Sequence, residues 1–280
     1  MHRNYHKSTL RKIVFVMLSF LLSLLLFFLS VSIVLYSTLL NPDYIFNNMD
    51  SENYFIEKTD EITLSLTDLG HASGLDESFF PELINKTMVA EDTRTYLDNV
   101  FSGKGTKIST ENFEKVLNNA LDNYIEENNI TDVDISSREQ LVGTAASIYR
   151  SSLELPLFNM LAGFIAGITA WMPFIIAFVS ITSIAICAAL VFANHWKHRA
   201  VKYIVCASTG TFLSLALIPA YLMISEKIKK INIPSKALYN TVVKCGDDIS
   251  MFFLAFSAFF LLVSAILFLL FRHMYKQVKE

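Results

Sequence analysis

The sequence has little cysteine and, over long stretches, no charged side chain. Only three cysteines occur in 280 residues, and none lies in the large polar region of residues 41–155. Small exported domains that lack a core are usually stapled by disulfides, so this region must be held together by helix packing. The uncharged stretches exclude an ordinary soluble protein, because 53% of the residues are hydrophobic and the mean hydropathy is positive.

Three uncharged runs are each long enough to cross a bilayer, which takes about 20 apolar residues as helix. They are residues 13–40, 203–224 and 251–271. The first follows a basic leader, residues 1–12, as a signal peptide would. Its 28 apolar residues exceed the 7–15 typical of a signal peptide, and no small-x-small cleavage site ends it. We expect residues 13–40 to be a retained anchor.

The fourth uncharged run, residues 156–196, fits either one crossing or two with a turn at Trp171–Pro173. With one crossing, ten Lys and Arg lie on the cytoplasmic side and five in the short outside loop of residues 225–250. With two crossings the numbers are nine and six. The positive-inside rule favours one crossing, with Trp171 at headgroup level and Pro173 in the first helical turn.

The resulting prediction is an all-α, polytopic membrane protein. It has four transmembrane helices, with an α-helical extracytoplasmic domain between the first and the second. The predicted segments are a cytoplasmic leader (1–12), span one (13–40), the acidic domain (41–155), an apolar interfacial or packed helix (156–170), span two (171–194), a cytoplasmic loop (195–202), span three (203–224), an outside loop (225–250), span four (251–271) and a cytoplasmic tail (272–280).

Residues 41–155 differ sharply in charge from the rest of the chain. They contain 22 acidic and eight basic residues, a net charge of −14, and the remainder carries +11. Such a domain repels nucleic acid and attracts cations or a basic partner. A solvated acidic surface that only keeps the domain soluble explains the same charge.

The acidic region shows helix signals and no alternating strand pattern. Asn41 and Pro42 mark a helix start, Gly70 and the glycine at 103 mark helix ends, and Ser136 with Glu139 forms a capping box. The clearest apolar stripe comprises Phe113, Val116, Leu117, Ala120, Leu121, Tyr124 and Ile125. We expect four or five amphipathic helices.

The sequence predicts no catalytic, cofactor-binding or metal-ligating residue. His195 and His198 are too few for a closed metal site. Asp132, Asp134 and Ser136 begin like a calcium loop, but Ser137 and Gly143 replace its required Gly and Glu. Residues 102–106, "SGKGT", lack the Walker spacing. Glu91 and Asp92 are the few acids that an unrecognised enzyme could use, and a solvated helix face explains them equally.

The predicted spans contain no ionisable side chain, which argues against a proton or ion path. Their polar residues more often mark helix contacts: Ser19, Ser23, Ser180, Ser183, Ser208, Thr209, Ser257 and Ser264. Gly163 and Gly167 form a small-xxx-small pair that permits close approach of another helix.

The layout, with the phrases "NPDY" and "SGLDESFFPELI", resembles uncharacterised four-span membrane proteins of low-GC Gram-positive bacteria. That resemblance implies no activity. The layout is also similar to permease subunits of the ABC-type mechanotransmission class, which implies a mixed α/β outside domain and a separate ATPase, with "NHWKHRAVK" as the coupling segment.

We therefore expect a non-enzymatic, multi-pass cell-membrane protein with both termini cytoplasmic. Its acidic domain senses or binds a protein partner at the cell surface. The alternative is a permease-like subunit of an ABC-type complex driven by a separate ATPase. The expected partners are the lipid bilayer and a protein at the acidic domain, with a second copy or an ATPase subunit as further candidates. Nucleic acid is not expected as a partner.

Overall fold

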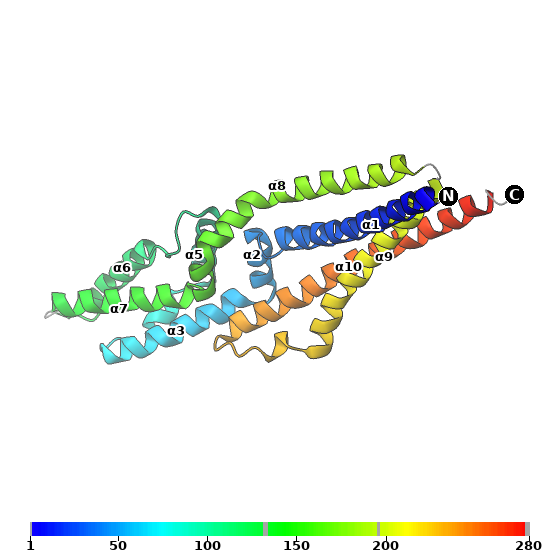
Figure 1. Cartoon of the computed structure of the whole chain (residues 1–280). Coiled ribbons are helices and arrows are strands. Elements are labelled where there is room, and N and C mark those ends of the chain that lie inside the picture. Colours follow the sequence, from blue (N-terminus) through cyan, green and yellow to red (C-terminus); the bar gives the residue numbers. More distant parts are fainter. Residues whose placement is uncertain (1, 131–133, 195–196, 278–280) are drawn as a thin grey trace. The chain divides into compact units, whose positions relative to one another are not determined.

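The computed structural model describes residues 2–130, 134–194 and 197–277, and every regular element in them is helical (Figure 1). The elements are α1 (His2–Ser37), α2 (Pro42–Ser51), α3 (Tyr54–Ala72), α4 (Phe79–Leu83), α5 (Lys86–Ser102), α6 (Glu111–Glu127), α7 (Ile135–Leu153), α8 (Pro156–Ala193), α9 (Lys197–Ser225), the 3-10 turn η1 (Ile228–Lys230) and α10 (Lys236–Gln277). Four of them, α1, α8, α9 and α10, are long and apolar enough to cross a membrane. The predicted all-α class is confirmed, and so is the presence of four helices long and apolar enough to span a membrane.

The chain forms two compact units. The span bundle comprises Met1–Leu39, Trp171–Ile231 and Cys245–Glu280. The helical domain comprises Leu40–Ala170 and Asn232–Lys244. The chain therefore enters and leaves the helical domain twice, and α8 and α10 each contribute residues to both units.

Two predicted helix boundaries in the helical domain are confirmed. Asn41 is the N-cap of α2, its side chain accepts hydrogen bonds from the N–H groups of Asp43 and Tyr44, and Pro42 follows at the first helical position. Gly103 ends α5 with a φ of 72°, a backbone conformation that glycine adopts without steric cost.

The predicted end of α3 at Gly70 is wrong, because the helix continues to Ala72. Gly70 is buried inside the helix, and a Cβ placed there would lie 3.0 Å from the ring of Phe80. The glycine therefore admits an aromatic ring. Gly74, with a φ of 82°, supplies the left-handed turn after the helix.

The predicted capping box at Ser136 is also wrong, because Asp134 caps α7. The Asp134 carboxylate accepts hydrogen bonds from the N–H groups of Ser136 and Ser137. Aspartate competes well with serine at this position, so the cap and the helix start lie two residues earlier, with α7 beginning at Ile135.

Six helices, α2 to α7, lie between residues 42 and 153 in the described part of the chain, where four or five were expected. The sequence pattern missed α4, whose five residues are too few to show a helical period. Phe80 on α4 is nevertheless buried and packs against α3.

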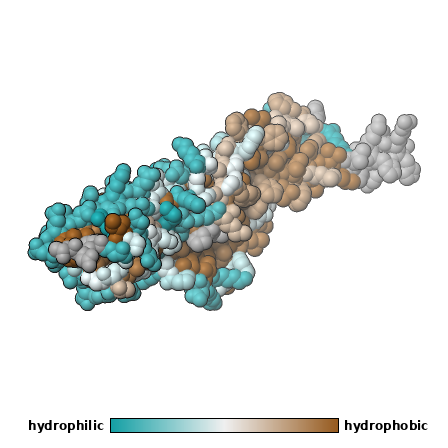
Figure 2. All heavy atoms as spheres, turned by 90° about the vertical axis from the view of Figure 1, so that its left-hand side faces the viewer, coloured by the Kyte–Doolittle hydropathy of each residue, from teal (hydrophilic) through white to brown (hydrophobic). Residues whose placement is uncertain are grey.

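A core rich in aromatic side chains holds the helical domain together. Tyr54 on α3, Phe113 on α6 and Tyr149 on α7 are fully buried. The rings of Phe113 and Tyr149 stack with centroids 4.4 Å apart. Helix α3 is central, because it packs against α2, α4, α5 and α7. On the face seen in Figure 2, most side chains over the helical domain are hydrophilic, and hydrophobic ones gather over the span bundle.

The run of residues 156–196 forms one helix, α8, as far as Ala193, and Pro173 lies in its interior. The prediction that Pro173 sits in a first helical turn is wrong, since α8 begins at Pro156. A proline within a long apolar helix is tolerated where neighbouring groups satisfy the freed backbone. No turn interrupts the helix at Trp171–Pro173, and the division between the two units falls between Ala170 and Trp171.

Hydroxyl groups and small residues join the helices of the span bundle. Helices α1 and α9 pack along each other, and Ser19 donates to the carbonyl of Tyr203 at 2.6 Å. Ser208 on α9 donates to the carbonyl of Phe260 on α10 at 3.0 Å, and Thr209 bonds Ser264 at 2.6 Å. The prediction that the polar residues of the spans mark helix contacts is confirmed at these positions.

Candidate functional site

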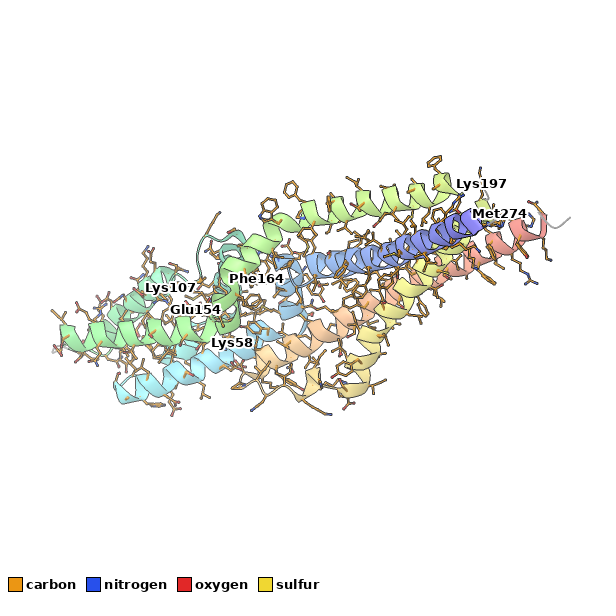
Figure 3. The ribbon with its side chains drawn as sticks, in the orientation of Figure 1. Lys58, Lys107, Glu154, Phe164, Lys197 and Met274 are labelled. Carbon is orange, nitrogen blue, oxygen red and sulfur yellow. The ribbon has the colours of Figure 1, made fainter. Side chains whose placement is uncertain are left out.

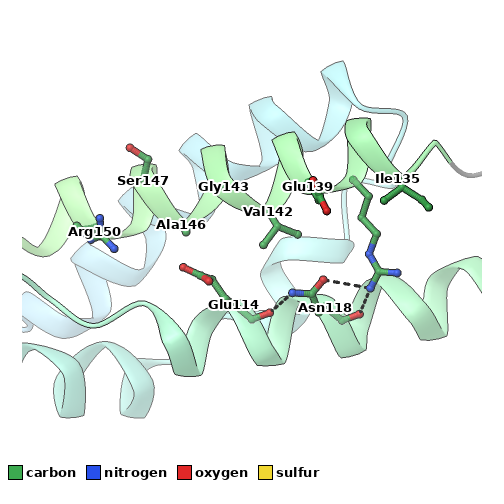
Figure 4. A pocket seen from close by; sticks show the side chains of 10 residues that line it. Glu114, Asn118, Ile135, Glu139, Val142, Gly143, Ala146, Ser147 and Arg150 are labelled. Atoms are coloured by element: carbon green, nitrogen blue, oxygen red, sulfur yellow. Dashed lines mark hydrogen bonds between the residues drawn. The ribbon is translucent and has the colours of Figure 1, made fainter.

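Helix α6 is the part of the helical domain bordered by the clearest surface grooves. Its inner face sends Phe113, Leu117 and Leu121 into the core, as its apolar stripe predicts. A groove of about 570 Å³ lies between α6 and α7 (Figure 4). Its lining residues are Glu114, Asn118, Ile135, Arg138, Glu139, Val142, Gly143, Ala146, Ser147 and Arg150.

Three small residues, Gly143, Ala146 and Ser147, form part of the α7 wall of the groove. A Cβ placed at Gly143 would meet no atom within 4 Å, so this glycine borders open space. Ala146 and Ser147 follow one turn later on the same helix. Because the distance between packed helices depends on the side chains at their contact, this wall allows another helix to approach closely.

Arg138 bridges the two helices at one end of the groove. It forms an ion pair with Asp122 on α6, with N and O atoms 2.7 Å apart. It also donates to the backbone carbonyl and the side-chain oxygen of Asn118, each at 3.2 Å (Figure 4). Its charge is therefore largely compensated within the chain.

Arg150 lies at the other end of the groove and binds the segment that precedes α6. It donates to the carbonyl of Ile108 at 3.3 Å and to the hydroxyl of Thr110 at 2.9 Å. The Thr110 hydroxyl donates to the Glu114 carboxylate at 2.6 Å. These bonds fix the start of α6 against α7 and keep this end of the groove in shape.

A second groove, of about 490 Å³, lies between α4 and α6 and is acidic. Three carboxylates, Asp76, Glu82 and Glu127, line it beside the rings of Phe79 and Tyr124, and its lining residues include no Lys or Arg. The ring centroids are 5.6 Å apart. Acidic and apolar surface therefore flanks α6 on this side as well.

The α7–α8 junction is fixed by buried tyrosine hydroxyls. The hydroxyl of Tyr96 donates to the side-chain oxygen of Asn159 at 2.7 Å and accepts from the N–H of Leu155 at 3.2 Å. Burial raises the pKa of Tyr96 to about 12. Glu154, between α7 and α8, accepts from the side chain of Asn159 and the N–H of Ile108 (Figure 3). This network has a structural role.

Asp92 has a structural partner in the helical domain. The Tyr149 hydroxyl donates to its carboxylate at 2.6 Å. Burial raises the pKa of Asp92, the Tyr149 hydrogen bond opposes that rise, and Glu91 adds to it. Burial likewise raises the pKa of Tyr149. The contact explains Asp92 as a core-edge residue that anchors α5 to α7.

The other residues that the sequence singled out are not brought together. Within residues 2–130, 134–194 and 197–277, no group of three or more His, Cys, Asp or Glu could hold a metal ion. Asp134 caps α7, and Asp132 and His195 lie outside the described residues. A Cβ at Gly163 or Gly167 would meet no atom within 4 Å, so no described helix of this chain closes on that pair.

Comparison of the chain with protein-family models, with curated proteins and with solved structures finds no match. The chemistry of the site therefore has to be derived from its own residues. The lining of the α6–α7 groove combines two branched apolar residues, Ile135 and Val142, with three small residues, two carboxylates and two arginines that hydrogen-bond within the chain.

The small residues Gly143, Ala146 and Ser147 on α7 do not figure among the residues predicted from the sequence. The spacing of Gly143, Ala146 and Ser147 carries the signal, since residues three and four apart share one helix face. The α7 pattern was interpreted through Leu141, Ala145, Ile148 and Tyr149, which form its buried side. The opposite side carries the groove.

Proposed function

We propose that this chain is a non-enzymatic, multi-pass cell-membrane protein whose helical domain lies outside the cytoplasm and binds a basic helical segment of a partner. The observation that carries the proposal is the open α6–α7 groove on a strongly acidic domain. Residues 41–155 carry −14, and Lys236 and Lys244 in the second stretch of the domain bring its net charge to −12.

The shape of the groove supports a helical occupant. From Ile135 to Arg150 the groove follows α7 for about 22 Å at 1.5 Å per residue, which is four helical turns. Val142 and Ile135 offer apolar contact, and Gly143 allows a close backbone approach. An amphipathic helix buries its apolar face in such a groove.

The charge of the domain supports a basic occupant. Glu114 and Glu139 lie in the groove beside Arg138, which is ion-paired with Asp122, and Arg150, which bonds Ile108 and Thr110. The excess of negative charge therefore comes from the domain around the groove. The field of an acidic domain steers cationic partners toward it and repels anionic ones. A lysine-rich segment satisfies both the apolar residues of the groove and the acidic surroundings.

The two stretches of chain that make up the helical domain support the proposed topology. Between its two stretches, Leu40–Ala170 and Asn232–Lys244, the chain passes through α8 and α9. One crossing by each helix returns the chain to the side from which it left. Two crossings by residues 156–196 would put Ser235 and Glu61 on opposite sides, although their side chains are hydrogen-bonded. The count of ten basic residues against five also favours cytoplasmic termini.

A fluorescent cationic amphipathic peptide of about 15 residues, four helical turns long, tests the proposal on the full-length protein in nanodiscs. We expect saturable binding that weakens with salt, and weaker binding by the variant Gly143→Leu, which fills the groove. The matched control is Gly105→Leu, since a Cβ at Gly105 also meets no atom within 4 Å but lies outside the groove.

An affinity unchanged by Gly143→Leu, or equal binding of a peptide with Glu in place of Lys, would contradict this function.

The permease alternative has less support, because it depends on layout alone. The helical domain contains no strand within its described residues, whereas that resemblance implies a mixed α/β outside domain. Recovery of an ATPase with the purified protein would favour the alternative.

A further inference from the structure

The start of α10 is bound to α3 through a serine that has two roles. Ser235 directly precedes α10, and its hydroxyl oxygen accepts a hydrogen bond from the N–H of Leu238 at 3.3 Å, which caps the helix. The same hydroxyl lies 2.9 and 3.0 Å from the two carboxylate oxygens of Glu61 on α3 and donates to that carboxylate. One side chain thus both starts the helix and fastens it to the helical domain.

A neighbouring carboxylate on α3 holds the next turns of α10. Lys236 forms an ion pair with Glu57 at 2.7 Å, and Asn240 donates to the other oxygen of Glu57 at 3.3 Å. Between these contacts, Ala237 is fully buried in the core of the helical domain, and Thr241 is 3% exposed. Polar contacts from Lys236 and Asn240 therefore surround the buried side chain of Ala237.

Glu61 is kept ionised for this contact. Its burial alone would raise the pKa of the carboxyl, but the hydrogen bonds from Lys58 and Ser235 outweigh that effect and lower it. Lys58 is itself buried on α3, with its ammonium 2.9 Å from Glu61 (Figure 3). The Glu61 carboxylate therefore accepts from two side chains at once, one on α3 and one at the start of α10.

We propose that residues 235–241 form a charge-held latch. Glu57 and Glu61 hold the start of α10 on α3, and added negative charge at Ser235 releases it without unfolding the rest of the helical domain. The latch fastens the loop before the last span to the helical domain. It is separate from the α6–α7 groove, because none of its residues lines that groove.

A single reporter cysteine measures release. In a variant without Cys187, Cys206 and Cys245, Thr241→Cys places a nearly isosteric thiol at the buried position. We expect slow labelling by a maleimide in the full-length protein in nanodiscs. Ser235→Asp keeps a capping side chain but sets a second carboxylate against Glu61. It should speed labelling by about tenfold or more, the factor expected when a hydrogen bond to a charged group is lost.

Matched variants separate the latch from general effects. Ser235→Thr keeps both the cap and the donor and should label as slowly as the parent. Asn232→Asp adds the same charge at an exposed residue of the same loop, and should not speed labelling. A second reporter, Thr93→Cys, lies in the fully buried part of α5 and should stay protected when Ser235→Asp is present.

Three results would overturn the latch. The first is a Ser235→Asp variant that labels as slowly as its parent. The second is equal acceleration by Asn232→Asp, which would mean that charge anywhere in the loop has the same effect. The third is loss of protection at Thr93→Cys, which would mean that the whole helical domain opens and that residues 235–241 are not released on their own.

Discussion

Aromatic side chains at the centre of the helical domain and on α8 in the span bundle differ sharply in exposure. In the helical domain, Phe113 and Tyr149 are fully enclosed and stacked on each other. On α8 in the span bundle, Phe174 and Phe178 are 68% and 69% exposed. The helical domain encloses these two rings, whereas α8 presents these two rings on the surface of the span bundle.

The difference in exposure is the one expected if the helical domain folds in water and the span bundle lies in lipid. In water, burying apolar surface is the dominant favourable term in folding, so the helical domain encloses a core. In lipid that driving force between helices is absent, and helices associate through close packing and hydrogen bonds. The bonds that Ser19, Ser208 and Thr209 form between spans are of that second kind.

The largest effect that tests this contrast is expected from Phe113→Ala. Removal of a fully buried, stacked phenyl ring costs about 3–5 kcal/mol of unfolding free energy in a water-facing core. Phe174→Ala, on the exposed face of α8, is the matched control and should change stability by less than about 0.5 kcal/mol. Urea unfolding of the full-length protein in detergent, followed by circular dichroism, measures both. Equal losses would mean that the two units are stabilised alike.

An intermediate effect is expected from Gly210→Ala, where α1 approaches α9. A Cβ at Gly210 would lie 2.6 Å from the Oγ of Ser23, so either the Ser23 hydroxyl must rotate away or the two helices must separate. We expect a loss of about 1–3 kcal/mol, typical of overpacking. Gly163→Ala meets no atom within 4 Å and is the control. Adding Ser23→Ala to Gly210→Ala should restore part of the stability. If Gly210→Ala alone is as stable as the parent, close packing at this position is not what joins the two helices.

The smallest effect concerns Asp92, whose pKa is raised above its ordinary value of 3.8, chiefly by burial. The folded state holds this proton to higher pH than the unfolded state does. Its stabilising contribution is therefore present below the unfolded pKa and lost as pH rises through the folded pKa. Asp92→Asn should remove that loss and raise stability at neutral pH by less than about 1 kcal/mol, since the group is half exposed. The unfolding free energy of both proteins, measured across the acidic pH range, tests this prediction. If its slope against pH is the same in Asp92→Asn as in the parent, the raised pKa of Asp92 is contradicted.

Much of the fold could be predicted from periodicity and caps. The stripe of α6, the Asn41–Pro42 start of α2 and the Gly103 end of α5 depend only on local rules, and each is confirmed. Gly70 could not be predicted, because its place inside α3 depends on the ring of Phe80, which arrives from another helix. Local signals fail where a tertiary contact decides the conformation.

Less of the candidate site could be predicted. The acidity of residues 41–155 was visible as a count, but the groove needs α6 and α7 side by side, which no local pattern specifies. The bond between Ser235 and Glu61 joins residues 174 apart in sequence. Residues 225–250 were therefore interpreted as a plain loop, although Asn232–Lys244 belong to the helical domain.

The central claim is that both stretches of the helical domain lie on the side of the membrane opposite the termini. Single cysteines at exposed positions test it most directly in intact cells: Asn123→Cys in the first stretch, Asn232→Cys in the second and Gln277→Cys near the C-terminus. The native Cys245 is nearly buried and unsuitable as a probe. We expect an impermeant maleimide to label positions 123 and 232 in intact cells, and position 277 only after permeabilisation. Labelling of 123 and 232 from opposite sides would contradict it.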